Sequence, residues 1–148
     1  MMFGQNRQQL RQFYHDVWQK QADKQSLSAL EIIVAQVINE HPEYQSIFNS
    51  DASLEQEYFV EQGQTNPFLH MGLHISLHEQ ISTDRPNGIR AIYQQLKSRY
   101  GDVHTTEHHM MECLTESLWL AQRNNQPPSE SDYLLALQQH VSDKNNGQ

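Results

Sequence analysis

Three histidines, His70, His74 and His78, follow one another at intervals of four residues. Side chains four residues apart lie on the same face of an α-helix, so these imidazoles are predicted to form one row that is two turns long. Apolar side chains flank the row and the polar side chains of the segment lie opposite, which indicates that the imidazoles face the protein interior. The flanking apolar residues are Met71, Leu73, Leu77 and Ile81.

Burying three imidazoles is unfavourable unless each one finds a hydrogen-bond partner or a metal ion. Imidazole pairs at this spacing are suited to a transition metal such as zinc, iron or manganese. Because His70 and His78 are about 12 Å apart along a helix that rises about 1.5 Å per residue, at most two adjacent histidines can bind one ion. The row therefore predicts half of a metal site. The alternative is a core network in which each histidine is bonded to a carboxylate or carbonyl.

The stretch 104–112 offers the other half of such a site. Glu107 falls in the middle of the apolar face of a predicted helix, where a carboxylate needs a partner. His108 lies at one edge of that face, with Glu112 four residues later. Inward histidine and glutamate side chains on facing helices are typical of helical-bundle metal sites. The predicted ligands for one or two ions are thus His70, His74, Glu107 and His108, with His78 and Glu112 as a further or supporting pair.

The other histidines and the other kinds of active site give weaker indications of function. His41 ends an apolar stripe just before Pro42, where capping of a helix C-terminus is the simpler interpretation and metal ligation the alternative. The metalloprotease motif H-E-x-x-H is absent from the sequence. Cys113 has no neighbouring cation to lower its pKa, so a nucleophilic thiol is not expected. Trp119 is expected in the core.

Helical periodicity and helix-start signals predict an all-α protein. Ser28 with Glu31 forms a capping-box pattern, Asn66-Pro67 opens another helix, and Gly101 ends one. Residues 49–66 are expected to be mostly loop. The expected fold is a single-domain bundle of about five to six helices over residues 1–141, with a disordered polar tail at 142–148. The helices are expected over about 6–23, 28–41, 66–82, 89–100, 103–123 and 129–140.

Composition limits the classes of partner. With 148 residues and a formal net charge of −8, the chain has the size of one domain and lacks the basic surplus of nucleic-acid-binding proteins. The four basic residues between Arg85 and Gly101 are interpreted as a solvated helix face. No apolar run approaches the roughly 18 residues of a membrane span, and no secretory signal is evident. A cytoplasmic protein is expected, which suits its single cysteine. A protein partner and the oligomeric state stay open.

Several motifs resemble a bacterial family of unknown function, DUF1841. They are NPFLHMGLH at 66–74, DRPNG at 84–88, EHHMMECL at 107–114 and WLAQR at 119–123, together with HPEY at 41–44 and the break at Pro127-Pro128. The resemblance implies a bacterial, cytosolic protein and assigns no reaction. The first hypothesis is therefore a helical protein that binds a transition metal between two helices, with hydrolysis or redox chemistry as the reaction classes if it is an enzyme. The alternative is a metal-free interaction module with a hydrogen-bonded histidine core.

Overall fold

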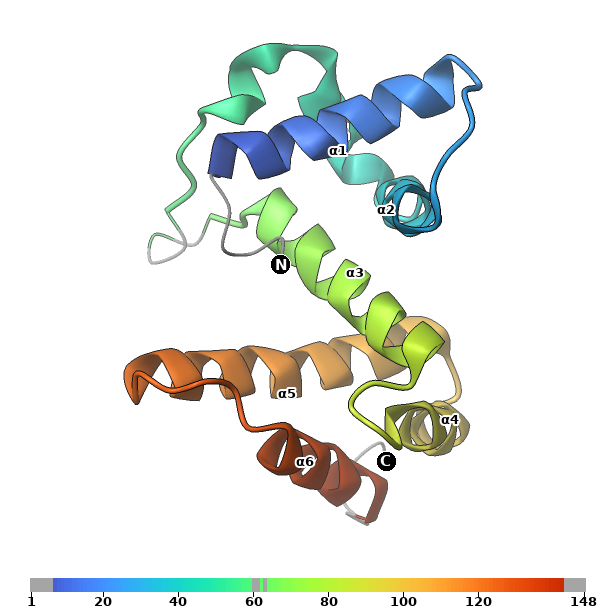
Figure 1. Cartoon of the computed structure of the whole chain (residues 1–148), viewed down its shortest axis with the longest axis vertical. Coiled ribbons are helices and arrows are strands. Elements are labelled where there is room, and N and C mark those ends of the chain that lie inside the picture. The colour runs from blue at the N-terminus through green and yellow to red at the C-terminus, as the bar shows by residue number, and fades with distance from the viewer. Residues whose placement is uncertain (1–6, 60–61, 63, 143–148) are drawn as a thin grey trace. The chain divides into compact units, whose positions relative to one another are not determined.

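The computed structural model describes residues 7–59, 62 and 64–142. In this part of the chain six α-helices and two 3-10 helices form, and no strand (Figure 1). The all-α prediction is confirmed. The chain divides into two compact units, Met1–Ile75 and Ser76–Gln148. No helix within the described residues is long and apolar enough to cross a membrane.

The first unit begins with two helices that pack against each other, α1 (Arg7–Ala22) and α2 (Ala29–Asn39). The capping box predicted at the start of α2 forms, since the Ser28 hydroxyl accepts from the Glu31 N–H and the Glu31 carboxylate accepts from the Ser28 N–H. The 3-10 helices η2 (Pro42–Asn49) and η3 (Asp51–Leu54) follow, and then α3 (Pro67–Thr83), whose first half belongs to this unit.

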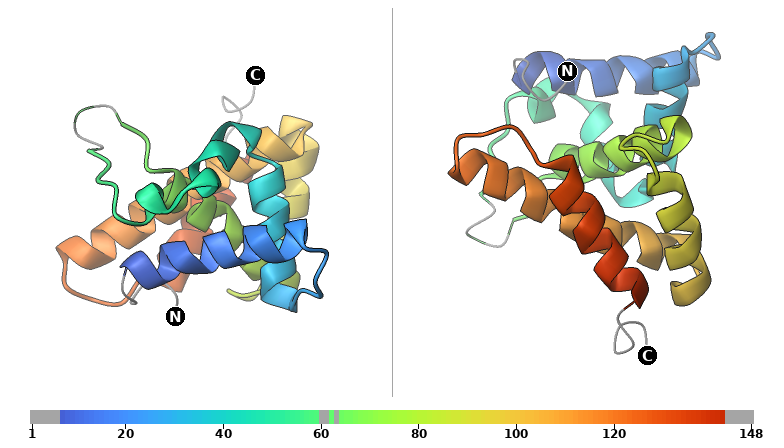
Figure 2. Two further views of the ribbon diagram at one scale, coloured as in Figure 1. Left: turned by 90° about the horizontal axis from the view of Figure 1, so that it is seen from above. Right: turned by 60° about the horizontal axis from the view of Figure 1, so that its bottom comes forward.

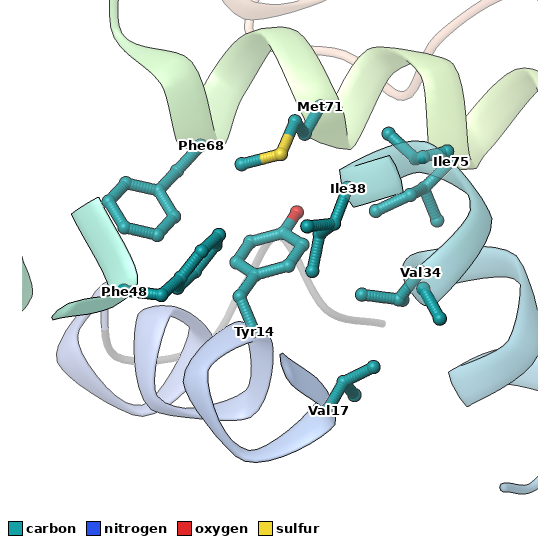
Figure 3. Close-up of a cluster of buried hydrophobic side chains, with 10 residues drawn as sticks. Tyr14, Val17, Val34, Ile38, Phe48, Phe68, Met71 and Ile75 are labelled. Carbon is teal, nitrogen blue, oxygen red and sulfur yellow. The ribbon is translucent and has the colours of Figure 1, made fainter. Parts of the chain in front are cut away.

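A core of aromatic and aliphatic side chains holds these elements together (Figure 3). The Tyr14 ring lies in its middle, with its centroid 5.5 Å from that of Phe68 on α3. Because α1, α2, η2 and α3 all contribute, this core fixes the end of α2 next to the first turns of α3. The core residues labelled in Figure 3 are Tyr14, Val17, Val34, Ile38, Phe48, Phe68, Met71 and Ile75.

The segment expected to be mostly loop contains η3, which the sequence periodicity does not indicate. Its start is capped by the Ser50 side chain, which accepts from the Ala52 N–H. Its buried Ser53 hydroxyl donates to the Ile47 carbonyl and lies 2.8 Å from Nε2 of His15 on α1. The short helix therefore depends on a contact between residues far apart in the chain, and local patterning cannot reveal it.

The second unit contains the end of α3 together with α4 (Ile89–Tyr100), α5 (Val103–Arg123) and α6 (Glu130–Ser142). Gly101 ends α4 in the left-handed region at φ 87°, which glycine adopts without a Cβ clash. Asp102 then caps α5 by accepting from the Thr105 N–H at 2.8 Å. Helix α6 packs against both α4 and α5 (Figure 2).

Near the end of α5, Trp119 is 54% exposed, so the prediction that it lies in the core is wrong. The Arg123 guanidinium lies over its ring, 5.2 Å from the centroid, and covers part of its apolar surface instead. Of the predicted tail, Ser142 is the last residue of α6, and 143–148 lie outside the described residues.

Candidate functional site

Three histidines of the first unit meet in what we call the histidine cluster, made of His41, His70 and His74. One ring nitrogen of each lies within 4.8 Å of those of the other two. Among the residues that the structure describes, this is the group of three or more His, Cys, Asp or Glu side chains found at a spacing suited to one metal ion. Two consecutive turns of α3 supply His70 and His74, and the residue before η2 supplies His41.

The cluster is largely shielded from solvent. His41 is 6% exposed and His74 is 5% exposed, whereas His70 is half-buried and forms the side nearest to solvent. Ring centroids are 4.8 Å apart for His41 and His74, and 5.2 Å apart for His41 and His70. The prediction that the row faces inward therefore agrees with the burial of His74, and His70 lies at the edge of the buried region.

A backbone hydrogen bond fixes the ring of His41. Its Nδ1 lies 2.7 Å from the Val37 carbonyl oxygen. A carbonyl can only accept, so Nδ1 carries the proton, and in the neutral ring Nε2 carries the lone pair. Metal-bound histidines commonly donate their other ring N–H to a carbonyl in this way, which fixes the tautomer and the orientation of the ring. His41 thus caps a carbonyl of the last turn of α2 and also presents a metal-binding nitrogen.

The spacing of His70 and His74 matches what one ion requires. Their Nε2 atoms face each other at 3.3 Å. Zn–N bonds of about 2.0–2.1 Å place two nitrogens of a tetrahedral site about 3.3–3.4 Å apart. The distance between these two nitrogens is therefore the one that a single zinc ion requires, and in this structure they share a hydrogen bond.

The Tyr44 ring stacks on the ring of His41. The two rings are parallel, at an interplanar angle of 2° and a centroid distance of 5.5 Å, and the Tyr44 ring lies 6.1 Å from that of His70. Burial raises the pKa of Tyr44, with a smaller contribution from Glu43, so its phenol stays protonated at neutral pH. The tyrosine adds an aromatic wall to the cluster.

Two other predicted ligands form a pair in the second unit. Nε2 of His78 lies 3.2 Å from Oε1 of Glu107, whose side chain is 6% exposed. The partner that a carboxylate on an apolar face was expected to need is thus a histidine of the predicted row. Burial, and then the charge of Glu107, raise the pKa of the nearby Tyr93.

The last two predicted ligands lie nearby on α5. His108 Nδ1 is 3.0 Å from the His104 carbonyl oxygen, and the rings of these two histidines are 4.1 Å apart. Glu112 is exposed. The structure therefore brings His70 to His74 and His78 to Glu107. A ligand role for His78, Glu107, His108 and Glu112 stays a prediction.

The family model of DUF1841, a domain of unknown function, matches residues 6–139. The chain belongs to this family. No curated protein and no solved structure matches it. Membership of DUF1841 assigns no activity, so the evidence for a function lies in the side chains that the fold brings together.

In this DUF1841 chain, sequence reasoning left His41 out of the predicted ligand set. The residue is 29 positions before His70 along the chain, and no spacing rule connects the two. A signal did exist, because His41 continues the apolar stripe of α2, and a histidine on the buried face of a helix requires a partner. What the sequence could not supply was the joint core of α1, α2, η2 and α3, in which His41 comes to lie beside His70 and His74.

Proposed function

We propose that this protein binds one transition-metal ion through His41, His70 and His74. The observation that supports the proposal is the convergence of three ring nitrogens within 4.8 Å, two of them already 3.3 Å apart. Imidazole ligands suit zinc and iron, whereas manganese prefers oxygen ligands, so zinc or iron is favoured among the three candidate metals. A cytoplasmic location belongs to the same proposal.

Three protein ligands imply an open position on the ion. Structural zinc sites are closed by four protein ligands, whereas catalytic sites have three and keep the fourth position for water or substrate. His70, which is half-buried, lies on the side from which water can reach the ion. If the site is catalytic, the reaction class that fits is metal-assisted hydrolysis, in which the ion lowers the pKa of its bound water.

The rival function is a metal-free interaction module. It is favoured by two hydrogen bonds of the cluster that need no metal, between His70 and His74 and between His41 and the Val37 carbonyl. Under this alternative the histidines are a core network, and the protein acts through its surface.

The two functions differ in metal content. The untagged protein is stripped with a chelator, dialysed, titrated with Zn²⁺ or with Fe²⁺ under anaerobic conditions, and measured by elemental analysis. We expect one ion to be retained per chain, with a rise in melting temperature, because an ion that binds only the native state stabilises it. Protein that retains no ion and keeps the same melting temperature with zinc, iron or manganese would overturn the proposal in favour of the metal-free module.

The remaining predicted ligands are tested in the same assay. Glu107→Gln and His108→Ala change the second unit and leave the histidine cluster intact. Retention of one ion by both variants supports the cluster as the site. Loss of the ion from either variant, in protein that is still folded by circular dichroism, would contradict the cluster and support the ligand set predicted from the sequence.

A further inference from the structure

The second unit contains a cavity of about 330 Å³ between α5 and α6. Residues of the second half of α5, the connection at 124–129 and α6 line it. This volume lies in the range of about 300–1,000 Å³ that is usual for small-molecule sites. It shares no residue with the histidine cluster, so a ligand here would be independent of the metal proposed above.

The lining of the cavity is partly charged and polar and partly apolar. Its charged groups are the carboxylates Glu116 and Asp132, and neither lysine nor arginine lines it. Amide and hydroxyl side chains also line it. The rest of the wall is largely apolar and consists of Cys113, Leu120, Ala121, Pro127, Tyr133 and Ala136.

Other groups nearby make the site more favourable for a cation. The last turn of α5 ends at the cavity, and the carbonyl end of a helix carries a partial negative charge. The basic residue of that turn, Arg123, lies against Trp119 outside the cavity. The first turn of α6, whose N–H groups would favour an anion, carries Glu130 and Asp132. Burial raises the pKa of Cys113 at the cavity wall to about 11, and the charges of Glu116 and Glu112 contribute to this increase.

We propose that this cavity binds a small organic ammonium ion. Its positive group pairs with Glu116 and Asp132, and its hydrocarbon part lies on Leu120 and Ala136. The apolar wall holds the hydrocarbon part beside two exposed carboxylates, so one ligand can use both kinds of contact at once. The lining carries two carboxylates and no lysine or arginine, so an anionic ligand of the same shape should be repelled.

The probe for this proposal is n-hexylammonium, compared with 1-hexanol and hexanoate at pH 7.5. Binding is followed by isothermal titration calorimetry and by shifts of the α5 and α6 amide resonances. We expect saturable binding of hexylammonium, binding of hexanol weaker by about tenfold or more, and no binding of hexanoate. Added salt should weaken hexylammonium binding, because the carboxylates are solvent-accessible.

Variants separate charge selection from simple apolar filling. Glu116→Gln and Asp132→Asn should each raise the dissociation constant for hexylammonium by about tenfold. Glu112→Gln is the matched control, since it removes the same charge one turn earlier on α5 and does not line the cavity. Ala136→Leu should block all probes. Equal binding of hexanol and hexylammonium, equal losses in the Glu112 control, or no saturable binding of any probe would each overturn the proposal.

Discussion

His74 is the residue on which the histidine cluster depends most. Its ring lies 4.8 Å from that of His41 and 4.9 Å from that of His70, so it approaches both of the other histidines. It is also buried, and a vacancy there would have to be filled by water or by collapse of the neighbouring rings. His70 is closer to solvent and can lose its ring at a smaller structural cost.

We therefore expect His74→Ala to abolish metal binding together with the stabilisation that metal provides. For the parent protein, an ion at a hundred times its dissociation constant adds about 2.7 kcal/mol to the free energy of unfolding, which raises the melting temperature by about 5–10 °C. Differential scanning fluorimetry with and without zinc measures this rise. The exposed His104 of α5 supplies the control, because His104→Ala should keep the whole increase. A variant at His74 that still gains several degrees with zinc would remove this residue from the site.

Cys113 supplies a second test at the level of one side chain. It is 6% exposed, and burial raises the pKa of its thiol to about 11. Because the thiolate is the reactive form, the folded protein at pH 8 should react with a disulfide reagent on the order of a hundred times more slowly than the urea-unfolded chain. Between pH 8 and 10 the folded-state rate should rise about tenfold per pH unit. A rate that already levels off near pH 9 would show an ordinary thiol.

At the scale of the element, the end of α2 positions His41, which follows it two residues later. The first turn of α2 is capped at its N-terminus. The capping box joins Ser28 and Glu31 by hydrogen bonds of 3.2 and 2.9 Å. Glu31 also pairs with Lys20 of α1 at 2.7 Å, and the two interactions lower the pKa of its carboxyl group. One short segment thus starts α2 and ties it to α1.

Removing this cap should destabilise the first unit by a predictable amount. We expect Ser28→Ala to lower the free energy of unfolding by about 1 kcal/mol, since a main-chain donor of the first turn loses its partner. Urea denaturation followed by circular dichroism gives the difference. Ser26→Ala, an exposed serine two residues earlier, should change stability by less than about 0.5 kcal/mol. Similar losses in both variants would mean that the capping bond contributes little.

Local signals explain which elements the sequence could predict. The starts at Ser28 and Asn66 and the stop at Gly101 depend on residues within one turn, and all three occur where predicted. The inward direction of His74 and the need of Glu107 for a partner follow from helical periodicity in the same way. The convergence of His41 with His70 and His74 could not be predicted, and neither could the bond that holds η3 through Ser53 and His15. Each depends on residues from different elements.

At the scale of the whole molecule, each unit buries one tyrosine almost completely. Tyr14 in the first unit is 1% exposed, and Tyr133 in the second is 4% exposed and donates to Gln80 Oε1 at 2.8 Å. Burial raises the pKa of both phenols well above their ordinary value. These two side chains report separately on the two units.

The raised pKa of each buried phenol makes the stability of its unit depend on pH in the alkaline range. Above pH 10, roughly the ordinary tyrosine pKa, the unfolded chain releases the phenol proton while the folded chain keeps it, so the free energy of unfolding falls as pH rises. Each tyrosine contributes a slope of about −1.4 kcal/mol per pH unit, and below about pH 9 it contributes none. Tyr14→Phe and Tyr133→Phe should each remove one such slope, measured by urea denaturation between pH 8 and 11.5. If the two units unfold in separate transitions, each variant should change the slope only for its own unit. If the chain unfolds in one cooperative transition, both variants should change the slope of that transition. An unchanged slope in either variant would show that its phenol ionises equally in the folded and unfolded states.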